Sequence, residues 1–224
     1  MLQFFVGPFL IWLPRVATAV LFILAVYLYL NRHRHEIKKY RFLNFKTLVL
    51  LVLGFTILYP IILTIAQYIF WNQSEFTRTF LNSPLSEDVP NTFFTDYFPA
   101  LFQSKLGYFF FYSLGRFWIG PMIAIAISYG FAGFLAVLRK HRDRFFDTGE
   151  IQLGLALSML VGWPNFAVFL PMVFLFIVLT GIVRAILFKE AYTTLGWPFI
   201  SAAAVALMFG SNLIDIFNLA VLRI

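Results

Sequence analysis

The chain has 224 residues, of which 61% are hydrophobic and only 12% are charged. Soluble domains carry about 25% charged residues, so this composition excludes a soluble globular protein and indicates an integral membrane protein whose core is the packing between its own helices. The net charge of +7 comes from basic residues in short segments beside apolar stretches, which indicates membrane topology and argues against nucleic-acid binding. The sequence contains no cysteine, which excludes disulfides, thiol catalysis and thiolate metal sites.

Six apolar stretches predict an all-α, polytopic membrane protein with about six transmembrane helices. They cover approximately residues 4–30, 47–70, 117–138, 151–162, 166–187 and 197–222. Pro14 is expected to kink or delay the first helix, so that its secure part is residues 16–30, and Pro60 is expected to kink the second. Residues 210–212 and Asp215 are expected to interrupt the last helix, with Asp215 near the membrane interface.

Residues 71–116 are the one long segment of mixed polarity. We expect them to form an extracytoplasmic insertion loop in a chain that is otherwise one transmembrane domain, residues 1–224. The part from 98 to 114 is aromatic and amphipathic, which favours a short helix lying in the membrane interface.

The basic residues predict the orientation of the chain. Loops 31–46, 139–150 and 184–190 hold twelve of the seventeen Lys and Arg residues, and they are alternate loops. The positive-inside rule therefore predicts that these loops face the cytoplasm and that both termini face outward. The expected location of the protein is the cytoplasmic (plasma) membrane. Tryptophans fall at predicted helix ends, as an aromatic belt requires: Trp71, Trp118, Trp163 and Trp197.

Three carboxylates, Asp143, Asp147 and Glu150, lie between the basic cluster that begins at Arg139 and the fourth apolar stretch. A carboxylate where a membrane helix meets the cytoplasm is costly to keep and suggests a functional site. The alternative is a solvated loop whose acids balance its arginines.

A resemblance to a known family covers the second half of the chain and includes Glu150. The order GEIQL (149–153), VGWPN (161–165), Lys189-Glu190 and Pro198-Phe199 resembles the type IV prepilin peptidases from about residue 121 to the end. These are polytopic aspartyl proteases with a Gly-x-Gly-Asp motif at the cytoplasmic start of a helix. The resemblance implies cleavage of prepilin-like leaders, which are basic and followed by an apolar helix, at the cytoplasmic face. The zinc-binding cysteine loop of many family members is missing here, and no cofactor or metal is expected.

The residues of the catalytic pair differ from that family. Glu150 takes the place of the motif aspartate, Asp147 takes the place of the first glycine, and Asn31 falls at the other aspartate. Aspartyl proteolysis needs two carboxylates that share a proton, which Asn31 cannot do. Glu36 and Asp147 are therefore the alternative partners of Glu150, Asp147 because i and i+3 share a helix face. The chain is accordingly either an altered protease or a catalytically dead relative.

Two other hypotheses stay open. Residues 5–9 (FVGPF) and 118–122 (WIGPM) are similar to prolipoprotein diacylglyceryl transferases, whose reactive His-Gly-Gly falls on residues 125–127. A third hypothesis is a non-catalytic membrane scaffold that binds a pilin-like single helix without cutting it. The expected partners are thus membrane lipids and such a helix.

Several polar residues have simpler explanations than catalysis. Arg15 is expected to extend to lipid headgroups at the outer face. His33 and His35 lack a third metal ligand nearby and are expected to contact water or headgroups. Asn165, after a Trp-Pro turn, is expected to cap the next helix.

Overall fold

The structure is a computed structural model that describes residues 2–32, 44–86, 92–141, 146–147, 149–187, 189 and 194–222. Within these ranges all regular structure is helical, with no strand, which confirms the all-α class. The chain divides into two compact units, residues 1–56 with 122–223 and residues 57–121. We call them the first unit and the second unit and describe each by itself. The predicted insertion, residues 71–116, falls within the second unit.

Five helices are long and apolar enough to cross a membrane: Phe9–Leu30, Phe45–Trp71, Gly107–His141, Phe166–Leu187 and Gly196–Ile216. The remaining predicted span forms helix α8 (Glu150–Val161), which has 12 residues. At 1.5 Å per residue α8 is about 18 Å long, whereas the hydrocarbon core of a bilayer is about 30 Å thick. The helical membrane class is therefore supported, while six spans and outward termini stay predictions.

Helix α1 (Leu2–Leu30) runs through Pro14, and α2 (Phe45–Trp71) runs through Pro60. The expected delay of the first helix to Val16 is therefore wrong. The last long helix, α10 (Gly196–Ile216), likewise continues through residues 210–212 without interruption. In an apolar environment the backbone gains more from intrahelical hydrogen bonds than in water, so isolated Pro or Gly-Ser-Asn sequences do not end a helix.

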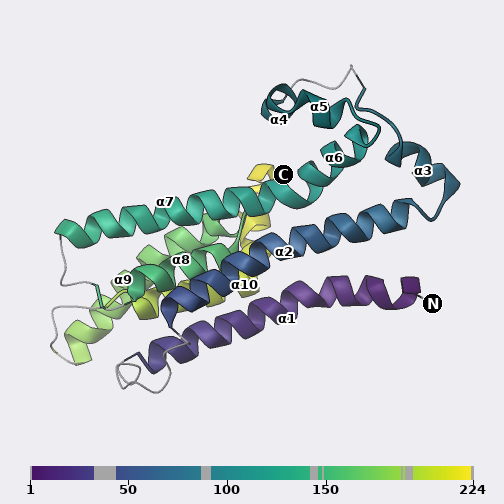
Figure 1. Ribbon diagram of the computed structural model, residues 1–224. Coiled ribbons are helices and arrows are strands. Elements are labelled where there is room, and N and C mark those ends of the chain that lie inside the picture. The colour runs from purple at the N-terminus through teal and green to yellow at the C-terminus, as the bar shows by residue number, and fades with distance from the viewer. Residues whose placement is uncertain are drawn as a thin grey trace. The chain divides into compact units, whose positions relative to one another are not determined.

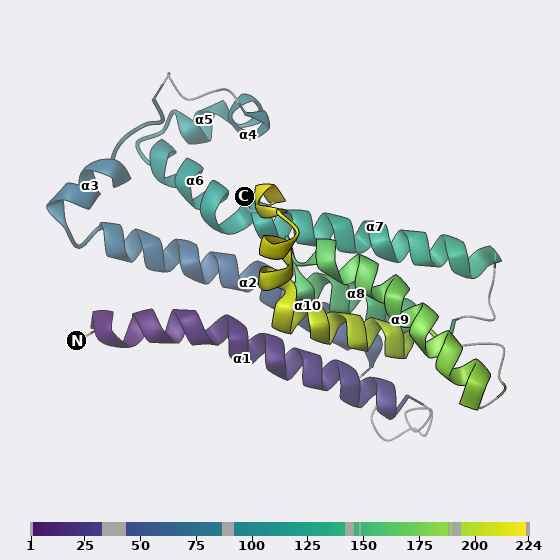
Figure 2. The same cartoon turned by 180° about the vertical axis from the view of Figure 1, so that it is seen from behind.

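In the first unit, α8 occupies the centre (Figure 1) and is buried along nearly its whole length. It packs against α1 and α10, and α10 also packs against α9 (Phe166–Leu187); Figure 2 shows α9 and α10 side by side from behind. Ala202, Ala203 and Ala206 on α10 are fully buried. Such small residues let membrane helices approach closely.

Aromatic rings from separate helices join this core. Phe131 of α7 (Ile119–His141) lies 5.9 Å from the rings of Phe166, Phe169 and Phe199. These edge-on contacts link α7 to α9 and α10, and each such pair adds about 0.5–1.5 kcal/mol beyond area burial.

The second unit has its own aromatic cluster. Trp71, at the end of α2, contacts the rings of Phe80, Tyr108, Phe109 and Tyr112. These rings come from α3 (Glu75–Leu81) and α6 (Gly107–Ser113), while α4 (Phe93–Tyr97) and α5 (Pro99–Phe102) connect them. The cluster holds the segment after α2 as a folded set of short helices.

The predicted interfacial helix over residues 98–114 is only partly correct. Residues from Gly107 onward belong to one long helix, in which α6 continues through a π-helical turn (Leu114–Trp118, η1) into α7. Trp118 therefore lies inside this helix and not at its end. Residues 107–118 include Arg116 and several glycine, tyrosine and serine residues, so they are more polar than the span that follows. This drop in hydropathy is why the sequence predicted the long helix to begin only at about residue 117.

Candidate functional site at the start of α8

Glu150 is the first residue of α8 and follows Gly149, whose φ of 84° lies in the left-handed region. A Cβ at Gly149 would collide with the ring of Phe45. Both conditions favour glycine, because it alone adopts this φ without strain and leaves room for the ring. The resulting turn directs the chain into α8 and buries the Glu150 side chain, which is 1% exposed.

The Glu150 carboxyl accepts three hydrogen bonds from backbone N–H groups. The N–H of Gly196 donates to Oε1 at 2.8 Å, and the N–H groups of Leu195 and Asp147 donate to Oε2 at 3.2 and 3.0 Å. Leu195 and Gly196 are the N-cap and first residue of α10. The first N–H groups of a helix lack partners within it, and its positive dipole end favours an anion. Glu150 thus caps α10 from the start of α8.

Tyr29 of α1 closes the site from another side. A Cβ at Gly196 would collide with the Tyr29 ring, and the Tyr29 hydroxyl lies 3.4 Å from the Thr194 hydroxyl. The Tyr29 ring also packs edge-on against Trp197 at 5.6 Å. Three helices, α1, α8 and α10, therefore meet around one buried carboxyl.

Asp147 lies beside Glu150 but faces a different partner. Its Oδ2 accepts a hydrogen bond from Arg32 Nε at 2.7 Å, in an ion pair whose side chains are 20% and 26% exposed. The Arg32 guanidinium also lies over the Tyr29 ring at 4.2 Å and donates to the Tyr29 carbonyl at 3.1 Å. The Asp147 carboxylate is thereby tied to the end of α1.

Burial raises the pKa of the Glu150 carboxyl above its ordinary value of 4.5. The backbone hydrogen bonds from Asp147, Gly196 and Leu195 lower that pKa, and the negative charge of Asp147 raises it again. Burial is the largest of these effects, because the charged form loses its hydration inside the protein.

The other predicted members of the pair are elsewhere or outside the described residues. The Asn31 side-chain amide donates a hydrogen bond to the Tyr27 carbonyl at 2.9 Å and thereby caps the last turn of α1. Glu36, His33 and His35 lie outside the described residues, as does Asp143. In the part of the chain that the structure describes, no three His, Cys, Asp or Glu residues gather as metal ligands.

The sequence analysis missed the contribution of Leu195 and Gly196. One signal was available: the sequence Thr-Leu-Gly-Trp-Pro starts a helix with leucine at the N-cap, where Ser, Thr, Asp or Asn would normally supply an acceptor. A buried helix start without its own cap needs an acceptor from elsewhere.

A scan against models of protein families and searches of curated proteins and of solved structures found no match.

Proposed function

We propose that this chain is a prepilin peptidase-like membrane protein that binds a single apolar helix without cutting it, and that Glu150 is a structural group. It would lie in the cytoplasmic membrane with loops 31–46, 139–150 and 184–190 on the cytoplasmic side. The observation that carries the proposal is the Glu150 carboxyl, which is 1% exposed and bonded through both oxygens to backbone N–H groups.

A carboxyl in this state is poorly suited to proteolysis. A general base must come within hydrogen-bond distance of a water and of the substrate carbonyl that the water attacks. To do so, Glu150 would have to leave the N–H groups of Leu195 and Gly196. A buried donor left without an acceptor costs about 1–3 kcal/mol, so the resting contacts oppose the catalytic position.

The ion pair of Asp147 opposes it as well. Two carboxyls that share a proton must face each other, whereas the Asp147 carboxylate is held by Arg32 at 2.7 Å. Sharing a proton with Glu150 would require giving up that charge-assisted hydrogen bond.

The surface of α9 is suited to an apolar helix. Its exposed large side chains form two adjacent rows at spacing i, i+4: Phe174, Val178, Ile182 and Ile186, and Leu175, Leu179 and Val183. Rows of this spacing are the ridges by which helices pack. Gly181 lies on the same helix with open space around it, and small residues are enriched where membrane helices meet.

An altered aspartyl-type protease is the second candidate, and the raised pKa of Glu150 favours it. In a carboxyl pair that shares a proton, the charge of one member raises the pKa of the other, and the charge of Asp147 acts on Glu150 in this direction. Asp147 would be the partner, or Glu36, which lies outside the described residues.

The two candidates separate in a reconstituted system. The full chain in liposomes is mixed with a synthetic peptide that has a basic leader and an apolar helix; photo-crosslinking reports capture and mass spectrometry reports cleavage. We expect capture without cleavage, retained in Glu150→Gln and in the exposed control Glu75→Gln. Gly181→Leu should weaken capture, whereas Gly133→Leu on α7, also with open space for a Cβ, is the matched control.

Cleavage that disappears in both Glu150→Gln and Asp147→Asn would instead establish the altered protease. Absence of both capture and cleavage contradicts helix binding itself.

A further inference from the structure

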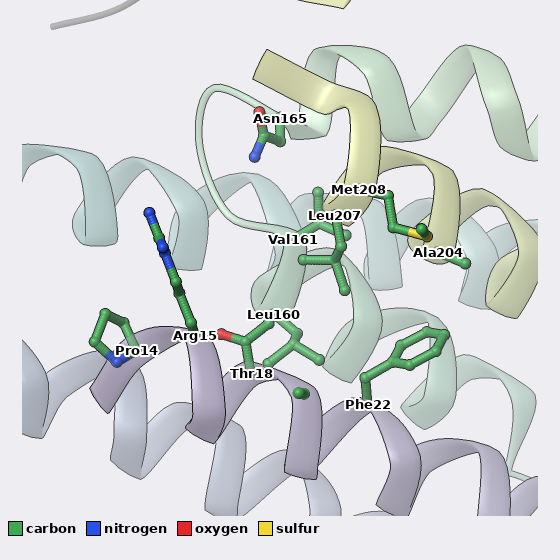
Figure 3. A pocket seen from close by; sticks show the side chains of 11 residues that line it. Pro14, Arg15, Thr18, Phe22, Leu160, Val161, Asn165, Ala204, Leu207 and Met208 are labelled. Carbon is green, nitrogen blue, oxygen red and sulfur yellow. The ribbon is translucent and has the colours of Figure 1, made fainter. Parts of the chain in front are cut away.

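A cavity of about 500 Å³ lies in the first unit between α1, the end of α8 and α10 (Figure 3). Helix α1 lines it with Arg15, Thr18 and Phe22, which recur at i, i+3 and i+7 and so share one face. Helix α10 lines it with Leu207 and Met208. These residues are therefore placed by regular helix geometry, and Asn165 joins them from the turn between α8 and α9.

Three hydrogen-bond donors line this cavity: Arg15, Thr18 and Asn165. Within the described residues, the side chains of Thr18 and Asn165 have no hydrogen-bond partner. The Arg15 guanidinium has no ion-pair partner there and lies over the Trp12 ring, 5.4 Å from its centroid. The amide oxygen of Asn165 faces α10, because a Cβ at Gly210 would lie 2.7 Å from Oδ1. Figure 3 shows the Asn165 amide nitrogen turned toward the cavity and the Arg15 side chain extending beside it.

The expectation that Asn165 caps α9 is thus not met by its side chain. The first N–H groups of α9 instead bond to backbone carbonyls, those of Gly162, Pro164 and Asn165. This leaves the amide available for a ligand.

The position of Arg15 along α1 favours an anionic partner. Arg15 lies 15 residues before the end of α1 at Leu30, a rise of about 22 Å, in a helix that crosses a hydrocarbon core about 30 Å thick. A cation at that depth is costly unless it is paired or reaches the headgroups. None of the residues lining the cavity is a carboxylate, so the cavity itself offers Arg15 no ion pair, and a bound anion would supply one.

The deeper part of the cavity is apolar. Phe22 lies about 10 Å further along α1 than Arg15, and Leu160, Leu207 and Met208 complete this part. The cavity is thus polar near one membrane face and apolar toward the bilayer centre. That order matches one molecule of lipid, with its headgroup at the interface and its chain inside.

We propose that this cavity binds an anionic phospholipid, with its phosphate at Arg15, Thr18 and Asn165 and one acyl chain between α1 and α10. The volume argues against a peptide helix. A helix about 10 Å across with a pitch of 5.4 Å occupies about 420 Å³ per turn, so the cavity would hold little more than one turn. Sites for small molecules have volumes of about 300–1,000 Å³, a range that includes this cavity and suits one headgroup phosphate with part of an acyl chain. The proposal does not depend on the function proposed for Glu150.

The test uses the full chain purified in detergent, with phosphatidylglycerol or phosphatidylcholine of identical acyl chains added, and native mass spectrometry to measure bound lipid. We expect the wild-type chain to retain one phosphatidylglycerol in preference to phosphatidylcholine. Arg15→Gln should weaken phosphatidylglycerol binding roughly tenfold or more, as the loss of a charge-assisted hydrogen bond does, and Arg15→Lys should retain part of it. Arg116→Gln, at an exposed arginine outside the cavity, should leave binding unchanged.

A second variant tests the acyl-chain half and does not depend on the folding of Arg15→Gln. Ala19 lines the cavity from an exposed position of α1, so Ala19→Phe should fill the cavity and reduce lipid retention while the chain stays folded. Equal retention of both lipids, or no effect of either substitution, overturns the proposal. If inorganic phosphate displaces the lipid at low concentration, the site recognises free phosphate and the acyl-chain part of the proposal is wrong.

Discussion

Two regions of the first unit handle polar side chains among apolar helices in opposite ways. At the start of α8, the acceptor Glu150 receives all its hydrogen bonds from the backbone of the same chain. Around the cavity, the donors Arg15, Thr18 and Asn165 receive no acceptor from the described residues. A polar group that the fold satisfies by itself acts in stability, whereas donors that the fold leaves without acceptors indicate a ligand. Both regions are built on α1, α8 and α10, so the difference between them lies in the side chains and not in the surrounding helices.

The largest effect that would test this contrast comes from Glu150→Ala. The substitution leaves the N–H groups of Asp147, Leu195 and Gly196 buried without an acceptor, and each such group costs about 1–3 kcal/mol. We expect the free energy of unfolding to fall by about 3 kcal/mol or more, measured by denaturant titration in mixed micelles. Glu75→Ala, at an exposed acid, should change it by less than about 0.5 kcal/mol. A loss below about 1 kcal/mol at Glu150 would show that its hydrogen bonds are not structural.

The next effect is stabilisation by the lipid. A ligand that binds only the folded chain at one hundred times its Kd stabilises that chain by about 2.7 kcal/mol. Phosphatidylglycerol should therefore raise the Tm of the wild-type chain in detergent, and the increase should be lost in Arg15→Gln. An equal increase in both chains would mean that the lipid acts as a general solvent and not at the cavity.

A smaller effect is expected from the ion pair next to Glu150. Arg32 and Asp147 are partly exposed, at 20% and 26%, and exposed pairs contribute up to about 1 kcal/mol. A double-mutant cycle with Arg32→Gln and Asp147→Asn should give a coupling energy of about 1 kcal/mol or less. If the coupling energy instead exceeds about 3 kcal/mol, Asp147 takes part in a buried network with Glu150. That result would support the altered aspartyl-type protease.

The most gradual effect is the pH dependence of stability. The pKa of Glu150 is raised in the folded chain, mainly by burial, so the folded state binds its proton more tightly than the unfolded state does. Its stabilising contribution is therefore complete below the unfolded pKa and is lost as the pH rises through the folded pKa. The difference in Tm between the wild type and Glu150→Gln should shift against the wild type over that window. A shift in the opposite direction would show that the backbone hydrogen bonds outweigh burial.

Composition and hydropathy predict the helical membrane class and the approximate position of every long helix. They fail where a boundary depends on surroundings. Pro14 does not delay α1, because intrahelical hydrogen bonds gain strength in an apolar medium. The start of the long helix at Gly107 was missed, because Arg116 and the Gly, Tyr and Ser residues of 107–118 lower the hydropathy there although the helix continues through them.

The candidate site was predictable only in part. Glu150 stands out in the sequence because a carboxylate at the start of an apolar helix is costly. Its partners at Leu195 and Gly196 are 45 and 46 residues away, and nothing local specifies that pairing. The expectation that Arg15 extends to lipid headgroups stays a prediction, and the cavity beside Arg15 also requires α10, whose packing no single segment of sequence contains.

The shortness of α8 bears on where its ends lie. At about 18 Å, α8 falls about 12 Å short of a 30 Å hydrocarbon core, and the turn after it is held by Trp163, whose Nε1 donates to the Leu222 carbonyl at 2.8 Å. Because α8 is buried among the other helices of the first unit, lipid does not have to adapt to its length. The bilayer thickness that suits the chain should instead follow from long helices with exposed apolar faces, such as α9 with 22 residues or about 33 Å.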